Sequence, residues 1–182
     1  MSISTTGALR SPFMRLAALA LTFGLVALTG CRSSALSDAE RSEIPQDAAA
    51  AVITSDLTAG ELYAATRKHL HEMGFVLRET EGDGLVIVTE KLGVGRTMTE
   101  LRLVGVVEKR MMRKPRLVLS GEYSFPPYGY QRARNKKSAR NRDAMAFEEI
   151  LLIARQLPHT NISFWTTEQL DETGFGKRNL YL

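Results

Sequence analysis

The sequence predicts an α+β fold in which a four- to five-stranded antiparallel sheet carries two helices on one face. Two stretches, near 58–73 and 142–156, repeat apolar residues at the spacing of an amphipathic helix. Four strand patterns lie between them, and their short connections indicate antiparallel neighbours. Because the strands form one run between the two helices, a two-layer domain is expected.

The chain opens with a pattern typical of a bacterial export signal. Residues 1–15 contain Arg10 and Arg15 and no acidic residue, and the apolar residues 16–28 follow. This apolar stretch is shorter than the roughly 20 residues that a permanent membrane-spanning helix needs. A signal peptide over residues 1–30 is therefore predicted, and a secretory signal cut elsewhere or an uncleaved anchor are the alternatives.

The only cysteine of the chain follows this signal directly. Leu28-Thr29-Gly30-Cys31 resembles the lipobox of bacterial lipoproteins. The resemblance implies cleavage between Gly30 and Cys31, a diacylglycerol on the cysteine sulfur, and an acyl chain such as palmitate on the new amino terminus. A lone exported cysteine without a disulfide partner also suits a modified thiol. Because Arg32 rather than aspartate comes next, the resemblance implies sorting to the outer membrane, with the domain facing the periplasm.

The remaining chain is long enough for one domain. Loss of residues 1–30 leaves 22 basic and 20 acidic side chains, a net charge of +2. Residues 31–55 are rich in Ser, Ala and charge without a sustained period, so they are expected to form a flexible tether, although their alanine run also admits a helical turn. An α+β domain over residues 56–166 and a C-terminal tail over residues 167–182 complete the predicted organisation.

The first helix is predicted near 58–73. Thr58 and Glu61 have the spacing of a capping box, and Gly74 follows as the expected C-cap. Its apolar stripe consists of Ala59, Leu62, Tyr63, Thr66, Leu70 and Met73. Such a stripe packs one side of a helix against a core.

The strands and the second helix follow. The four strands are expected at 75–78, 85–90, 100–108 and 116–123, and a last short strand around Ile162 and Phe164. The second helix begins after the N-cap candidate Asn141 and ends before Pro158. Its apolar stripe consists of Ala144, Phe147, Ile150, Leu151 and Ala154.

The sheet is predicted to be apolar on both faces. If Leu101, Leu103, Leu117 and Leu119 face the helices, alternation turns Val104, Val106 and Val118 to the opposite side, beside Val86 and Val88. We call these five valines the valine face. It is a candidate partner surface, although cover by the tail is the favoured alternative. Met145 and Leu152, on the charged side of the second helix, are further candidate contacts.

A second resemblance supports this fold. Residues 62–91, LYAATRKHLHEMGFVLRETEGDGLVIVTEK, resemble the helix-then-hairpin opening of the domains in BamC-type lipoproteins, which are accessory parts of the machinery that inserts outer-membrane barrels. The break at Gly74-Phe75 and the start of the second strand at Gly84-Leu85 carry the resemblance. It implies a non-enzymatic accessory role, in a chain with room for one such domain rather than two.

The sequence contains no catalytic motif. His69 and His71 lie about 200° apart around the first helix, so they cannot share a metal ion. We interpret His69 as a half-buried packing residue, His71 as solvated and His159 as part of a loop. The glycine pair in residues 93–96 lacks the context of a phosphate-binding loop. We therefore expect no enzyme activity, no cofactor and no metal.

Two basic clusters are candidate sites for anions. The first consists of Lys109, Arg110, Arg113, Lys114 and Arg116 around Met111 and Met112, and the second of Arg132, Arg134, Lys136, Lys137, Arg140 and Arg142. They are either solvated loops or contacts to acidic material such as lipopolysaccharide phosphates, anionic lipid or an acidic protein face. Nucleic acid is disfavoured by the predicted compartment.

The leading hypothesis is a non-enzymatic lipoprotein, anchored to the outer membrane, that acts as an accessory or scaffold and binds an envelope protein partner. The alternative is a binding module for a lipid or an acidic small molecule held between the helices and the sheet.

Overall fold

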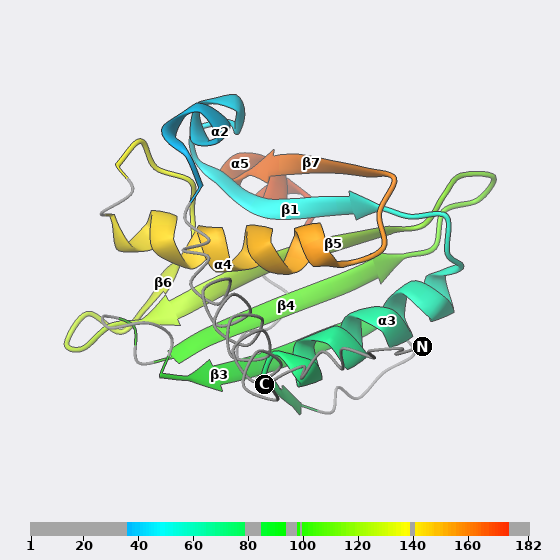
Figure 1. The fold of residues 1–182 in the computed structure, drawn as a ribbon, viewed down its shortest axis with the longest axis horizontal. Coiled ribbons are helices and arrows are strands. Elements are labelled where there is room, and N and C mark those ends of the chain that lie inside the picture. Colours follow the sequence, from blue (N-terminus) through cyan, green and yellow to red (C-terminus); the bar gives the residue numbers. More distant parts are fainter. Residues whose placement is uncertain (1–35, 79–84, 94–97, 99, 139–140, 175–182) are drawn as a thin grey trace, which may run out of the picture. The chain divides into compact units, whose positions relative to one another are not determined.

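The computed structural model describes residues 36–78, 85–93, 98, 100–138 and 141–174. In these ranges the chain has an α+β fold with an open, seven-stranded antiparallel sheet (Figure 1). The predicted class is confirmed, while the sheet has more strands and the fold more helices than expected. Helices α3 and α4 lie on one face of the sheet, and α5 lies on the other (Figure 1).

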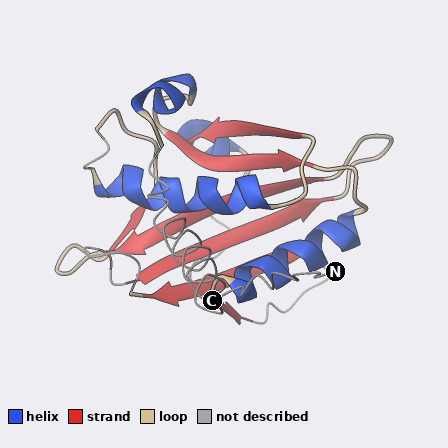
Figure 2. Cartoon of the chain, in the orientation of Figure 1, coloured by secondary structure: helices blue, strands red, loops and turns tan. Residues whose placement is uncertain are grey.

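Helices and strands follow one another in a mixed order along the chain. Figure 2 shows the two kinds of element in the fold. The helices are α2 (Asp38–Glu43), α3 (Ala59–Glu72), α4 (Arg142–Gln156) and α5 (Thr167–Glu172). The strands are β1 (Ala48–Thr54), β2 (Val76–Arg78), β3 (Val86–Leu92), β4 (Glu100–Glu108), β5 (Arg116–Ser124), β6 (Tyr130–Arg132) and β7 (Asn161–Thr166). Their order in the sheet is β2-β3-β4-β5-β1-β7, and the short β6 also pairs with β5.

The two long helices form as predicted because their caps are local. At the start of α3, Glu61 N donates to the Thr58 hydroxyl at 3.3 Å, and Thr58 N donates to the Glu61 carboxylate at 2.8 Å. Past its end, Gly74 has φ of +83°, a conformation that costs glycine little. The side-chain oxygen of Asn141 accepts a hydrogen bond from Asp143 N at 2.8 Å, which caps α4.

The expectation that residues 31–55 form a flexible tether is wrong for the part that the structure describes. Ala48–Thr54 form β1, which pairs with β5 on one side and β7 on the other. Residues 48–53 of this strand are at most 3 % exposed. The domain therefore includes residues before position 56. It also extends past position 166, because Thr167–Glu172 form α5 where a tail was expected.

Strand β1 is buried on both faces. Ala48, Ala51 and Ile53 belong to the main core with α4, while Ala50 and Val52 pack with Leu170 of α5 on the opposite face. Small side chains allow a helix to approach each face closely. Because both faces are apolar, the strand lacks the alternation of a half-exposed strand, and alanine has low β-propensity.

The main core lies between the sheet and helices α3 and α4. As predicted, Leu101, Leu103, Leu117 and Leu119 point into it, and all four are fully buried. The core also includes Leu70 of α3 and Phe147, Ile150 and Leu151 of α4. The ligand cavity that one hypothesis required between helices and sheet is therefore occupied by these side chains.

Gly121 of β5 lies where the sheet packs closely against α4. A Cβ added there would lie 2.8 Å from the Arg102 carbonyl oxygen, 2.8 Å from a Leu103 methyl and 3.2 Å from Ile150 Cδ1. Gly121→Ala should therefore lower the free energy of unfolding by about 1–3 kcal/mol, the usual cost of overpacking. Gly60→Ala in α3 is the matched control, because an added Cβ there has no neighbour within 4 Å.

The control should be neutral or stabilising by up to about 1 kcal/mol, since alanine restricts the unfolded chain. Urea denaturation of both variants measures the difference. Equal stability of the two variants would contradict the packing that the structure gives to α4.

Candidate functional site

The valine face is buried in this structure. Its position opposite the main core is confirmed, since its side chains belong to separate clusters. Val118 packs with Leu170 of α5 and is 1 % exposed, so part of the predicted tail covers that end. Val104 and Val106 cluster with Val86 and Val88 and are 4 % and 7 % exposed. The expectation that Val104, Val106 and Val118 form an open partner surface is therefore wrong.

The two further candidate contacts on α4 are also not fully exposed. Met145 is half-buried and packs against the main core, and Leu152 is half-buried. Neither forms part of an open apolar patch. The large hydrophobic side chains that are exposed among the described residues lie elsewhere: Val76, Leu92, Met111, Met112, Tyr128 and Tyr130.

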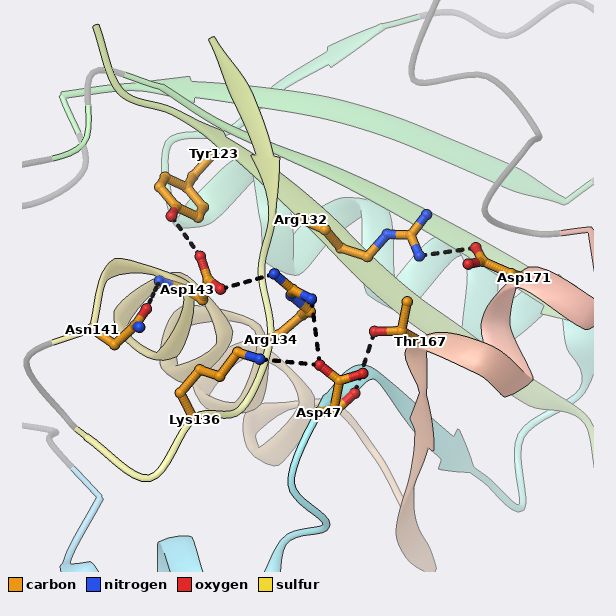
Figure 3. A network of polar contacts seen from close by, with 9 residues as sticks. All are labelled: Asp47, Tyr123, Arg132, Arg134, Lys136, Asn141, Asp143, Thr167 and Asp171. Carbon is orange, nitrogen blue, oxygen red and sulfur yellow. Dashed lines mark hydrogen bonds and ion pairs between the residues drawn. The ribbon is translucent and has the colours of Figure 1, made fainter. Parts of the chain in front are cut away.

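Three of the six residues in the second basic cluster pair with carboxylates inside the domain (Figure 3). Arg132 donates to Asp171 of α5 at 2.9 Å. Arg134 reaches Asp143 at 3.2 Å and Asp47 at 3.5 Å, and Lys136 reaches Asp47 at 3.3 Å. The prediction that Arg132, Arg134 and Lys136 are free to bind an external anion is corrected accordingly, because acidic groups from distant segments already neutralise them.

The remaining cations of this cluster differ from one another. The Arg142 guanidinium lies 3.1 Å from the centre of the Phe125 ring. Arg140 lies outside the described residues. Lys137 is exposed and has no carboxylate partner among the described residues, so it is available to an external group.

Together with Tyr123, these pairs form a polar network that joins five segments of the chain: β5, residues 132–136, α4, the residue before β1, and α5. The buried Tyr123 hydroxyl of β5 donates to Asp143 of α4 at 2.6 Å. Burial, and then the hydrogen bond to the Asp143 carboxylate, raises the pKa of Tyr123 far above its ordinary value. Asp47 lies immediately before β1, and Thr167 N of α5 donates to its carbonyl oxygen at 3.1 Å. The network therefore stabilises the fold rather than presenting an open reactive group.

Asp47 is the centre of this network. Partial burial alone would raise the pKa of its carboxyl, but hydrogen bonds from Thr167 and Lys136 and the charges of Lys136 and Arg134 lower the pKa below its ordinary value. Its φ of +66° allows the chain to turn into β1, a conformation that Asp and Asn tolerate better than most residues.

A cavity of about 410 Å³ lies beside the network. Its walls come from the end of α2, from the residues that follow α2 and from the loop before α4, and they include Arg41, Ile44, Asn135, Lys136 and Lys137. None of the described residues that line it is acidic. Arg41 is buried and forms an ion pair with Glu148 of α4. The sequence did not indicate this cavity, because its walls are about 90 residues apart in the chain.

The first basic cluster is divided between paired and unpaired residues. Arg116 pairs with Glu108 and lies over the Trp165 ring, and Lys114 contacts Asp56 at 2.5 Å. Lys109, Arg110 and Arg113 have no carboxylate partner in the described parts of the chain. Between them Met111 is 92 % exposed and Met112 is fully exposed. We call residues 109–113, in the turn between β4 and β5 (Figure 1), the hairpin tip.

The histidines remain apart from these sites. His69 is half-buried, and His71 and His159 are exposed, in agreement with their interpretation from sequence. A ring nitrogen of His159 lies 2.7 Å from the Leu157 carbonyl oxygen. Across the described ranges, no three side chains of the His, Cys, Asp or Glu type gather as metal ligands would.

The predicted signal peptide and lipidation site, residues 1–30 and Cys31, lie outside the described residues. No helix within the described ranges has both the length and the apolar character needed to cross a membrane. A comparison with models of known protein families gives no match, and neither does a comparison with curated protein sequences.

Asp47→Asn should weaken the domain at neutral pH and not at low pH. Because the folded-state pKa of Asp47 is lowered, its ionised form contributes stability above the unfolded-state pKa of about 3.9, and this contribution is lost as the pH falls through the folded-state value. The side chain is 42 % exposed, so solvent screening limits the expected loss at pH 7 to about 0.5–1 kcal/mol. Asparagine also tolerates the positive φ.

Urea denaturation at pH 7, 5 and 2.5 measures this difference. Asp56→Asn is the control, since Asp56 makes one exposed pair with Lys114 and should change stability less. A loss in Asp47→Asn that stays constant down to pH 2.5 would show that the carboxylate charge is not what stabilises the network.

Proposed function

We propose that this protein is a non-enzymatic lipoprotein, anchored to the outer membrane through Cys31, whose periplasmic domain binds an envelope protein partner as an accessory or scaffold. The lipobox resemblance supports the anchor. The observation that carries the partner-binding role is the hairpin tip, where two exposed methionines lie between three cations that have no carboxylate partner among the described residues. We therefore propose the hairpin tip, and not the buried valine face, as the surface that binds the partner.

A short linker supports a position close to the membrane. Leu36 is buried in the main core, and only four residues lie between it and Cys31. The five Cα-to-Cα steps from Cys31 to Leu36 span at most about 18 Å when fully extended. A domain lipidated at Cys31 would therefore be held next to the lipid surface, where it meets membrane-bound partners.

The chemistry of the hairpin tip favours a protein contact. Methionine is apolar, flexible and polarizable, so it adapts to irregular apolar pockets. Burial of one such side chain contributes about 1.5–3 kcal/mol, which the free protein does not gain at the tip. Lys109, Arg110 and Arg113 would meet an acidic rim around such a pocket, which favours fast and oriented association.

The second candidate function is the binding of an acidic ligand. The space between helices and sheet is filled, so this function would need a different position. The cavity beside Arg41 provides one, with basic residues in its walls.

Replacement of Cys31 tests the anchor. Wild-type protein should incorporate labelled palmitate and sediment with outer membranes, because the thiol and the new amino terminus carry the acyl chains. Cys31→Ala should lose the label and leave that fraction. Arg32→Asp, the matched control, should keep the label and change only the membrane to which the protein sorts. Equal labelling of wild type and Cys31→Ala would remove the anchor from the proposal.

Photo-crosslinking tests the hairpin tip. A benzophenone amino acid in place of Met111 should give a discrete protein adduct in intact cells. The same probe in place of Leu92 is the control, because Leu92 is also exposed but pairs in register with Glu100 at the other end of the sheet. The adduct from position 111 should fall about tenfold in the double variant Arg110→Glu, Arg113→Glu.

The same charge reversal on α3, Arg67→Glu with Lys68→Glu, should leave the adduct unchanged, since both residues are exposed there. Adducts to lipid alone, or identical adducts from positions 111 and 92, would contradict a specific protein contact at the tip.

A further inference from the structure

The cavity beside Arg41 contains buried polar atoms without partners. Arg41 is 4 % exposed and Asn135 is 2 % exposed, and both line the cavity. Among the described residues, the Nε and Nη1 atoms of Arg41 have no hydrogen-bond partner, although the Nη2 atom forms the ion pair with Glu148. Buried polar groups in folded proteins are nearly always satisfied, so these atoms indicate a missing partner.

The hydrogen bonds of Asn135 indicate which kind of ligand group would bind next to its side chain. Its Nδ2 donates to the Ile44 carbonyl oxygen at 3.0 Å and to the Pro45 carbonyl oxygen at 3.1 Å. These bonds determine the orientation of the amide, and they leave Oδ1 without a partner. A ligand next to Oδ1 must therefore offer a donor, such as a hydroxyl or an amine.

The positive charge of the cavity walls indicates that the rest of the ligand is an anion. Arg41, Lys136 and Lys137 line the cavity, and none of the described lining residues is acidic. Among the described residues Arg41 pairs with Glu148 and Lys136 pairs with Asp47, whereas Lys137 has no carboxylate partner. The free Nε–H and Nη1–H groups of Arg41 lie on different edges of the guanidinium, so each would donate its own hydrogen bond to an oxyanion, and a neighbouring ammonium strengthens that preference.

We infer that this cavity binds a phosphate monoester or diester that also carries a hydroxyl group, with the phosphate on Arg41 and Lys137 and the hydroxyl on Asn135. A volume of about 410 Å³ lies within the usual range of ligand pockets and admits a group of the size of glycerol phosphate. Such chemistry occurs in the headgroup of phosphatidylglycerol and in soluble phosphate esters. The inference rests on the cavity alone and does not depend on the hairpin tip or on the lipid anchor.

Binding to protein purified from membranes in a neutral detergent tests this inference. The probes are glycerol 3-phosphate, methyl phosphate, and mixed micelles that contain phosphatidylglycerol or phosphatidylcholine. Glycerol 3-phosphate should bind several-fold more tightly than methyl phosphate, because only the former donates to Asn135. Lys137→Glu should weaken binding at least about tenfold, the effect of placing a like charge beside the phosphate.

Arg67→Glu, an equal charge reversal at an exposed position of α3, is the matched control and should leave binding unchanged. Arg41→Lys keeps a cation for Glu148 but removes the free Nε–H and Nη1–H donors, so it should also weaken binding about tenfold. If Arg41→Lys does not fold, Lys137→Glu still decides, because its exposed side chain has no carboxylate partner to lose among the described residues.

The two sources of the ligand give different results. Binding of free glycerol 3-phosphate that Lys137→Glu removes supports a soluble ester. A rise in melting temperature with phosphatidylglycerol but not phosphatidylcholine micelles, without binding of the free ester, supports a lipid headgroup. Absence of both responses, or responses that Lys137→Glu leaves unchanged, would overturn the inference.

Discussion

The fold depends on a strand of small residues that is buried on both faces. Strand β1 lies between β5 and β7, with α4 against one face and α5 against the other. Larger side chains at Ala48–Ala51 would push one helix away, because protein interiors are close-packed and do not absorb added volume. Removal of β1 would leave one edge of β5 without a partner strand over Arg116–Ser120, with β4 still paired on the other edge, and would separate β7 from the sheet.

The contacts at the start of β1 determine which basic side chains pair with carboxylates inside the domain. Asp47 N donates to the Asn135 carbonyl oxygen, and Asn135 N donates to the Ala48 carbonyl oxygen, so the loop before α4 runs along the beginning of the strand. Cations in that loop are thereby brought to Asp47 and Asp143. Among the described residues, the cations of the hairpin tip and Lys137 have no carboxylate partner, and these are the two positions where we propose contacts to other molecules.

Local signals in the sequence predict the parts of the fold that local chemistry determines. Helices α3 and α4 agree with prediction to within a few residues, because the capping groups at Thr58 and Asn141 lie within the same short segments. Strand β1 is missed because an alanine run with two buried faces has neither alternation nor β-propensity. The contacts of Arg134 with Asp47 and of Asn135 with Ile44 are missed because the two partners lie 87 and 91 residues away, and no pattern in one sequence connects them. The cavity follows from these same long-range contacts.

Hydrogen exchange of the β1 amides tests most directly whether the segment before position 56 belongs to the folded domain. As a central strand, Ala50 to Ile53 should exchange only through global unfolding, at rates that match those of Leu117 and Leu119 in β5. A flexible tether would exchange these amides at the rate of an unprotected chain. Fast exchange at Ala50–Ile53 beside slow exchange at Leu117 and Leu119 would contradict the fold, the short link to Cys31 and the cavity at Arg41 together.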